Sequence, residues 1–160
     1  MTQAEFAISG CGICAIIDRV KAGAFRDFVA ELPGCYVILG DRQYYRGYCV
    51  MLSKIHATEL YLMPADDARV LFEEVRLVAE AIASVVNPWK MNYECLGNSE
   101  PHVHWHLFPR YESDEQRRGP IWIRAEAEQK IELDENDRIE LIDALRRAIA
   151  TRIPSATPAR

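Results

Sequence analysis

The chain has 160 residues, a length that favours a single domain with one hydrophobic core. Hydrophobic residues make up 49% of the sequence, charged residues 27%, and the formal net charge is -5, which argues against a broad electrostatic surface for nucleic acid or an anionic membrane. No segment approaches the roughly 20 apolar residues that cross a bilayer, and the first residues lack the basic start of a secretory signal, so we expect a cytoplasmic location.

The first half of the chain predicts one short helix and two strands. Apolar residues at helical spacing predict a helix over about 22–32, which Pro33-Gly34 ends. The β-branched and aromatic run 35–39 is typical of a strand, and a second strand is predicted over about 47–53. Because turn residues separate these two runs, we expect the strands to pair.

The second half predicts two helices and a hairpin. A long helix is expected over about 65–86, because apolar residues recur there every three or four positions. The segments 90–96 and 102–110 predict two strands that a polar turn joins into a hairpin. A last amphipathic helix is expected over 135–153, with Asp134 as its N-cap.

These elements predict an α+β fold with an antiparallel sheet and packed helices. We expect one domain over residues 1–153 and a flexible tail over 154–160. The five cysteines are an odd number, and three of them stand in apolar runs, so they favour free thiols over a disulfide framework.

Three of the four histidines fall at alternate positions of segment 102–110, whose sequence is HVHWHLFPR. Side chains two residues apart in a strand point to the same face, so His102, His104 and His106 are expected to form a row. Their successive Cα atoms would lie about 6.6 Å apart, which allows two neighbours, but not all three, to share a metal ion. A neutral imidazole can be a nucleophile, a general base or a metal ligand, and spacing alone leaves these roles open.

Segment 102–110 resembles the signature of the histidine-triad (HIT) family, which is His-x-His-x-His followed by two apolar residues and often Pro-Arg. The similarity extends to the strand and polar loop at 91–98, to the Cys-x-x-Cys pair at 11–14 and to the segment 53–56. Together these motifs span residues 11–111 in the family's order. The resemblance implies a single HIT-type domain that forms a homodimer.

The resemblance implies hydrolysis or transfer at the α-phosphate of a nucleotide, with diadenosine polyphosphates or nucleoside phosphoramidates as substrates. In the family, the middle histidine attacks phosphorus and forms a nucleotidyl-histidine intermediate that water cleaves, which implies His104 as the nucleophile. His102 and His106 are implied to orient His104 and to contact phosphate oxygens. No cofactor is required for this chemistry, because a neutral imidazole needs no proton removed before it attacks.

Further residues are candidates for binding the substrate. Asn98 lies four residues before the first histidine, where many family members carry glutamine, and its amide can donate to a phosphate oxygen. Asn92 and Ser99 are lesser candidates of the same kind, and Asp41 stands near the position that binds the ribose in the family. A turn or strand-end position explains each of these residues equally well. Many members have a Gly-His step where this chain has Gly-Tyr, which makes Tyr48 a possible replacement donor.

Some family members with an N-terminal Cys-x-x-Cys hold a structural zinc ion through those cysteines, a later histidine and the first triad histidine. The resemblance implies Cys11, Cys14, His56 and His102 as a Cys2His2 site in this chain. Such a site would orient His102 and, through it, His104. Two ordinary free thiols are the alternative.

Two other functions stay open. One is a nucleotide-binding regulatory module with a zinc-stabilised N-terminus, in which the triad binds a nucleotide and turns it over little. The other is a catalytic metal ion held by neighbouring triad histidines. In the first of these, as in the hydrolase, the binding partner is a small nucleotide.

Overall fold

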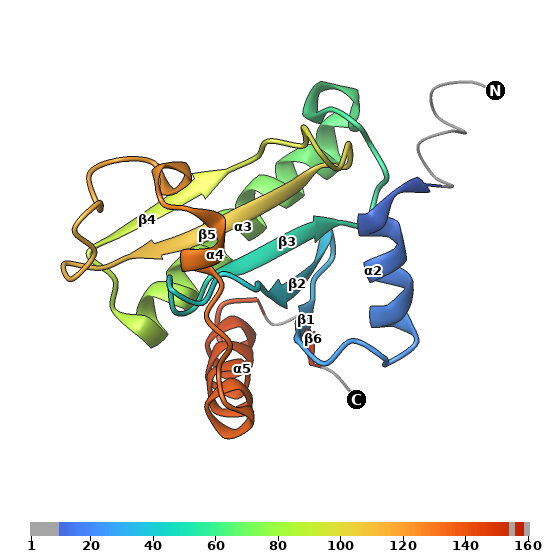
Figure 1. Ribbon diagram of the computed structural model, residues 1–160. Helices are drawn as coiled ribbons and strands as arrows, with labels where there is room; N and C mark the ends of the chain where they lie inside the picture. Colours follow the sequence, from blue (N-terminus) through green and yellow to red (C-terminus); the bar gives the residue numbers. More distant parts are fainter. Residues whose placement is uncertain (1–9, 154–155, 159–160) are drawn as a thin grey trace.

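A six-stranded antiparallel sheet forms the centre of the protein, with strand order β4-β5-β3-β2-β1-β6 (Figure 1). The structure is a computed structural model that describes residues 10–153 and 156–158. The strands are β1 (Phe28–Glu31), β2 (Cys35–Leu39), β3 (Cys49–Ser53), β4 (Lys90–Glu94), β5 (His104–Arg110) and β6 (Thr157–Pro158). The helices are α2 (Gly12–Lys21), α3 (Ala65–Val86), α4 (Glu126–Gln129) and α5 (Glu135–Ala150), with short 3-10 turns η1 (Leu60–Leu62) and η2 (Ile121–Ile123). This arrangement confirms the expected α+β fold.

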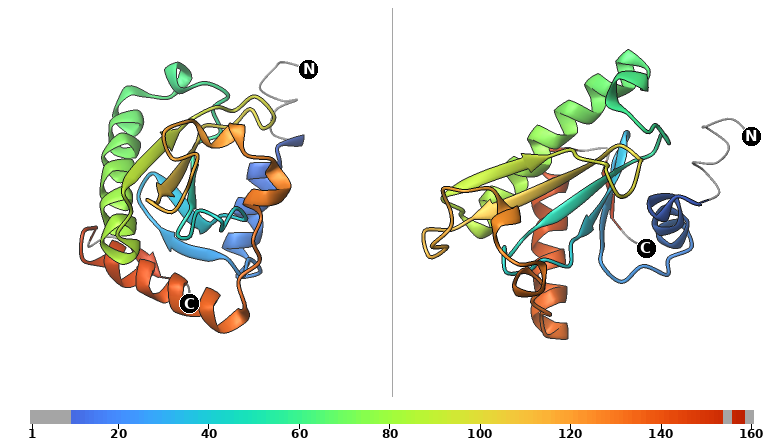
Figure 2. Two further views of the ribbon diagram at one scale, coloured as in Figure 1. Left: turned by 60° about the vertical axis from the view of Figure 1, so that its left-hand side comes forward. Right: turned by 45° about the horizontal axis from the view of Figure 1, so that its top comes forward.

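Helices cover both faces of the sheet, as the left view of Figure 2 shows. On one face, α3 and α5 pack together and bury apolar side chains such as Leu71, Val78 and Leu145 completely. On the other face, α2 places Ile13 and Ile17 in a second apolar cluster. Each such side chain contributes about 1.5–3 kcal/mol when it leaves water, so both layers stabilise the sheet. Among the described helices, none is long and apolar enough to cross a membrane.

The prediction of a helix over 22–32 is wrong. The helix lies earlier, at α2, and ends where Gly23 adopts a positive φ of 68°. The N–H of Ala24 then donates to the carbonyl of Arg19 (2.9 Å), a pattern typical of a helix closed by a left-handed glycine. The apolar residues that follow have helical spacing, but two of them, Phe28 and Val29, lie in β1, which pairs with β2.

The other predicted elements agree closely with the structure. The predicted bounds of β2 and α3 are confirmed, whereas β3 begins two residues late and β4 ends two residues early. The Asp134 side chain accepts a hydrogen bond from the Asp137 N–H (2.9 Å), which confirms it as the N-cap of α5. In the predicted tail, Thr157–Pro158 pair with β1. The rest of that tail lies outside the described residues.

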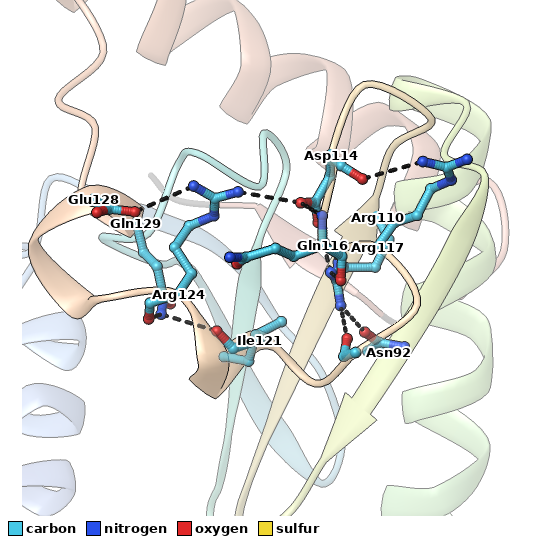
Figure 3. Close-up of polar contacts among 10 residues, drawn as sticks. Asn92, Arg110, Asp114, Gln116, Arg117, Ile121, Arg124, Glu128 and Gln129 are labelled. Carbon is cyan, nitrogen blue, oxygen red and sulfur yellow. Dashed lines mark hydrogen bonds and ion pairs between the residues drawn. The ribbon is translucent and has the colours of Figure 1, made fainter.

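Residues 111–125, which we call the strap, connect β5 to α4 and pass alongside β4 before they return across the sheet (Figure 1). Arg110, at the end of β5, is completely buried and holds the strap in place. Its Nη2 donates to the Asp114 carboxylate (2.6 Å) and to the Gln116 carbonyl (2.9 Å). Arg124 also contacts Asp114 (3.3 Å), so one carboxylate joins both arginines (Figure 3). Because an unpaired buried charge costs several kcal/mol, these contacts keep the strap against the sheet.

Candidate active site and metal-binding cluster

β5 places His104 and His106 on the sheet face that also carries α2. Their partners on β3 are Leu52 and Val50, whose side chains share that face. The two imidazole centroids lie 4.7 Å apart in an edge-to-face arrangement. The alternating pattern therefore predicted the placement of these two rings correctly.

His102 departs from the expected row, because β5 begins only at His104. The His102 ring is buried and lies against His56, with the two Nδ1 atoms 3.2 Å apart. The main-chain carbonyl of His102, rather than its ring, contacts His104, whose Nδ1 lies 2.6 Å from that oxygen. A carbonyl can only accept, so Nδ1 of His104 carries a proton, and in the neutral ring the lone pair is on Nε2.

His106 has a buried tyrosine as its neighbour. Its Nδ1 lies 2.6 Å from the hydroxyl oxygen of Tyr48. Burial, followed by the charges of His104 and Arg42, lowers the pKa of His106 to about 4, so the ring is neutral at pH 7. Burial also raises the pKa of Tyr48, which keeps its proton on the hydroxyl. The pair is therefore a hydrogen bond between two neutral groups.

Close packing fixes the ring of Tyr48. It stacks on Phe108 with centroids 4.0 Å apart and an interplanar angle of 3°. A Cβ at Gly40 would lie only 2.1 Å from Tyr48 Cε1, so glycine is required there. The structure thus brings Tyr48 beside the triad at the position where the sequence lacks the Gly-His step.

Cys11, Cys14, His56 and His102 bring four ligand atoms within 4.8 Å of one another. The Cys14 Sγ lies 3.3 Å from His56 Nδ1 and 3.5 Å from His102 Nδ1, and Cys11 Sγ lies 3.4 Å from His102 Nδ1. A tetrahedral zinc ion with Zn–S of about 2.3 Å and Zn–N of about 2.0–2.1 Å requires about 3.5 Å between sulfur and nitrogen and about 3.3 Å between nitrogens. The four side chains therefore fit a tetrahedral zinc ion.

The surroundings of the cluster also suit a cation. His102 Nε2 lies 2.9 Å from the Ser53 carbonyl oxygen, so Nε2 donates and the lone pair of Nδ1 points into the cluster. Burial, and then the Cys11 side chain, raise the pKa of Cys14 to about 11, because a thiolate there has a second sulfur beside it. A bound cation would offset the cost of placing a thiolate there, since metal ligation requires the thiolate.

The predicted substrate-binding residues lie in different settings. Asn92 shares the triad face, but its Oδ1 accepts a hydrogen bond from Arg110 (2.9 Å) and helps to hold the strap. Asn98 and Ser99 are exposed between β4 and β5, and in the described part of the chain neither side chain has a hydrogen bond. Asp41 lies at the rim of a pocket, where the Lys130 ammonium is 3.2 Å away.

That pocket has a volume of about 540 Å³ and lies beside the triad face. Apolar side chains from α2, β2 and β3 line it, among them Ile16, Ile38 and Val50. Val50 is the β3 partner of His106, so the pocket is next to the histidine pair. An apolar cavity of this size with a few polar groups at its rim is typical of a small-molecule site.

Glu94 is a feature of the site that the sequence did not assign. It stands opposite His106 in the β4–β5 ladder and shares its face. Within the described residues, its Oε2 is buried and has no hydrogen-bond partner, and burial raises its pKa. Alternation along residues 90–94 predicts that Glu94 lies on the same face as Asn92. Its burial could not be predicted locally, because the strap that covers it is distant in sequence.

Comparisons with known proteins agree with this fold. The family profile described as the HIT domain matches residues 24–113. A histidine triad protein from Marinobacter aquaeolei VT8 is similar, with a TM-score of 0.69 and 22% identity over 84% of this chain and 95% of that chain. A hypothetical histidine triad nucleotide-binding protein from Sulfolobus tokodaii strain7 has a TM-score of 0.67 and 23% identity over 88% and 93%.

A Zn-bound histidine triad family protein from Mycobacterium smegmatis has a TM-score of 0.63 and 21% identity, over 89% of this chain and 95% of that chain. The search of curated proteins found no match. At these identities the solved structures establish a shared fold, whereas the domain profile covers more than half of the sequence. The chain is therefore a member of the HIT family.

Proposed function

We propose that the protein is a nucleotide hydrolase or transferase that acts at the α-phosphate through a nucleotidyl-histidine intermediate on His104. The observation that carries this proposal is the hydrogen bond from His104 Nδ1 to the His102 carbonyl (2.6 Å). It holds the ring in the tautomer whose Nε2 lone pair is free, so the neutral nucleophile is ready without a proton transfer.

The proposed reaction has two steps. The His104 Nε2 lone pair forms a bond to the α-phosphorus, and the bond from phosphorus to the leaving group breaks, with its electron pair going to the leaving atom. Water then attacks the phosphorus, and the P–N bond breaks with its electron pair returning to Nε2. In the hydrolase the acceptor is water, and in a transferase it is another nucleophile.

We infer that Tyr48 sets the tautomer of His106. When the Tyr48 hydroxyl donates to His106 Nδ1, the proton of the neutral ring stays on Nε2, where it can donate to a phosphate oxygen. A fixed donor at that position stabilises the negative charge that develops in the transition state. Tyr48 is thus proposed as a positioning residue that acts through His106.

Substitution of Tyr48 by phenylalanine is expected to lower kcat about tenfold with little change in KM, the effect of one hydrogen bond worth about 1–2 kcal/mol. Without the donor, the neutral ring is less stabilised, so the pKa of His106 rises from about 4 and the acid limb of the rate profile moves to higher pH. Tyr45→Phe is a matched control, because Tyr45 is equally buried and packs on Phe108. If both variants have the same pH profile as the wild type, Tyr48 has no such role.

The pocket beside the triad is proposed as the site for the nucleoside. Its apolar walls, including Ile16 and Ile38, can hold a base, and Asp41 at its rim can accept hydrogen bonds from the ribose hydroxyls. Lys130 lies 3.2 Å from Asp41, so the ribose would share this carboxylate with an ion pair on the surface. Asn98 and Ser99, which are exposed near the start of β5, are proposed as phosphate contacts in the bound state.

We propose zinc as a structural ion at Cys11, Cys14, His56 and His102. The interatomic distances fit tetrahedral ligation, and the similar protein from Mycobacterium smegmatis is a Zn-bound member of the family. When bound, zinc would supply a rigid link between the start of α2, the segment after β3 and the start of β5. Zinc would fix the position of His102, whose carbonyl orients His104.

A homodimer is proposed from the free edge of the sheet. β4 is the outer strand at one side, and Tyr93 on this strand is half-exposed. Phe72 of α3 is also half-exposed and packs edge-to-face on Trp105, with centroids 5.2 Å apart. An unpaired strand beside exposed aromatic side chains is suited to pairing with a second copy.

Light scattering is expected to give twice the mass of the chain, and Phe72→Glu is expected to shift the mass toward that of the monomer because it would bury an unpaired carboxylate. Ile139→Glu, a similar change at an exposed position on α5, serves as the control. A wild-type protein that is monomeric at about 50 µM, a concentration at which a micromolar dimer would persist, contradicts the proposal.

The experiment that tests the proposed function is chemical trapping of the intermediate. The protein is mixed with a substrate labelled in the α-phosphate, quenched in alkali, where a phosphoramidate bond survives, and digested to locate the label. Label on the peptide that contains residues 102–110 supports the proposal. Tight nucleotide binding without label or product from several leaving groups would instead favour a regulatory module.

A further inference from the structure

A second cavity lies on the opposite side of His106 from the nucleoside pocket. It has a volume of about 490 Å³ and lies between β4 and the strap. We call it the strap cleft, and its walls are formed by Trp89, Lys90, Asn92, Tyr93, Glu94 and residues 117–120. Figure 1 shows the strap passing beside β4.

The strap cleft carries three cations without matching carboxylates. Lys90 and Arg118 are exposed, and Arg117 lies over the half-exposed ring of Trp89, 5.6 Å from its centroid. Within the described part of the chain, no carboxylate lies within 4.0 Å of these three cationic groups. The one acidic residue in the cleft wall is Glu94, whose pKa is raised by burial. The cleft is therefore locally positive in a protein whose formal net charge is -5.

The register of the sheet relates the cleft to the reacting centre. Glu94 is the β4 partner of His106, and Asn92 is the partner of Phe108, so both point to the triad face. β3 lies on the other side of β5, and its residue Val50 pairs with His106 and lines the nucleoside pocket. An α-phosphate at the histidine pair would thus have one cavity on each side.

The cleft is held open by fixed contacts. Arg110 is fully buried, and its Nη1 donates to the Gly119 carbonyl (2.8 Å) in the strap and to Asn92 (2.9 Å) in β4. Arg117 Nη1 donates to the Asp114 carbonyl (3.4 Å), while Asp114 itself is neutralised by Arg110. The cations of the strap therefore need little rearrangement to meet an anion.

We propose that the strap cleft binds the leaving group of the substrate as a chain of phosphates, so the preferred substrate carries a phosphoanhydride bond at the α-phosphate. The inference rests on the function proposed above. When His104 attacks, the bond from the α-phosphorus to the bridging oxygen breaks, and the leaving phosphate chain takes the electron pair as an oxyanion. Arg117 and Arg118 stabilise this added charge, which is larger in the transition state than in the substrate.

The test compares a polyanionic leaving group with a small neutral one. The substrates are P1,P4-di(adenosine) tetraphosphate and adenosine 5′-phosphoramidate, which releases ammonia. In the double variant Arg117→Ala/Arg118→Ala, kcat/KM for the tetraphosphate is expected to fall at least about tenfold, the scale of one or two charge-assisted contacts. The phosphoramidate should change less than about threefold, since its leaving group makes no such contact.

Two further variants separate local charge from other effects. Arg117→Lys/Arg118→Lys keeps the charge and is expected to recover most of the activity on the tetraphosphate. Arg147→Ala/Arg152→Ala removes the same charge from the last turn of α5 and from the residue after its C-cap, where Arg152 pairs with Glu80, and should leave both substrates unaffected because α5 packs on the other face of the sheet. Adenosine 5′-tetraphosphate, which lacks the second nucleoside, is assayed in parallel. If Arg117→Ala/Arg118→Ala lowers kcat/KM equally for adenosine 5′-tetraphosphate and for the dinucleotide, the cleft recognises the phosphate chain. It then does not recognise a second base stacked on Trp89.

Equal losses on the tetraphosphate and the phosphoramidate, or no loss on either, would overturn the proposal. If the wild type turns over neither substrate, the proposed function fails, and the cleft is tested by binding of inorganic tripolyphosphate to the full chain in calorimetry. Binding that weakens at least about tenfold in Arg117→Ala/Arg118→Ala still supports an anion site in the cleft. Binding that this variant leaves unchanged excludes it.

Discussion

Replacement of His104 by alanine is expected to reduce turnover on the order of 10⁴-fold or more, which is the scale on which loss of a covalent nucleophile acts. The reason is the geometry of one side chain: Nδ1 is fixed on the His102 carbonyl at 2.6 Å, and Nε2 alone is free to attack. No other neutral nucleophile of the described residues has this arrangement on the triad face. The measurement is single-turnover release of nucleoside monophosphate, together with the amount of trapped label.

The control for this prediction is nucleotide binding. His104→Ala removes one largely buried ring that does not line the nucleoside pocket, so the pocket, which α2, β2 and β3 line, stays intact. The dissociation constant for a nucleoside monophosphate is therefore expected to stay within about threefold of the wild-type value, a change of less than 1 kcal/mol. Label and turnover that persist in this variant would exclude His104 as the nucleophile.

The sequence predicts the elements of the sheet well where local patterns decide the structure. β2 and α3 are uninterrupted patterns with clear end signals, and the structure reproduces both. The error at residues 22–32 has a physical cause, because apolar residues at positions 25, 28, 29 and 32 satisfy a helical period while their burial is decided by pairing with β2. Gly23, which follows the basic last turn of α2 with Arg19 and Lys21, is the sequence signal for the end of this helix.

Within the site, alternation along β5 is sufficient to place His104 and His106 on one face. It fails at His102, because the strand starts after this residue and its ring turns toward Cys11, Cys14 and His56. Only the resemblance to the family suggested that grouping, since the four residues are up to 91 positions apart in the sequence. The burial of Arg110 and Glu94 by the strap is likewise a long-range effect that no local pattern encodes.

Substitution of Cys14 by serine is expected to remove bound zinc and to lower the melting temperature by about 10 °C. A structural zinc ion contributes about 10–16 kcal/mol in peptides that fold around it. A loss of about a third of this free energy lowers the melting temperature of a domain of about 150 residues by about 10 °C. Elemental analysis should give one zinc per chain for the wild type and much less for the variant. Cys95→Ser is the matched control, because Cys95 is also partly buried but lies outside the cluster.

Acidification should release the same zinc ion. His56 and His102 bind a metal only as neutral rings, and Cys14 binds it only as the thiolate, so protons compete with zinc and the affinity falls as the pH decreases. Stability that depends on zinc is therefore present at neutral pH and lost on the acid side. Zinc content below about a tenth of an equivalent, in protein never exposed to a chelator, contradicts a site whose affinity matches structural zinc.

The metal prediction also extends to the chemistry, because His102 belongs to both parts of the site. Its Nδ1 faces the proposed zinc ion, its Nε2 is held by the Ser53 carbonyl, and its own carbonyl fixes His104. When the ligand set is broken, the His102 backbone loses one of its supports, and the tautomer and aim of His104 become less well defined. We therefore expect Cys14→Ser to reduce kcat about tenfold, while KM changes little, at temperatures where the fold persists. A loss of this size is within the range seen when groups that orient metal ligands are removed. A variant that loses zinc and stability but keeps the wild-type kcat would show that the ion supports the fold without orienting the nucleophile.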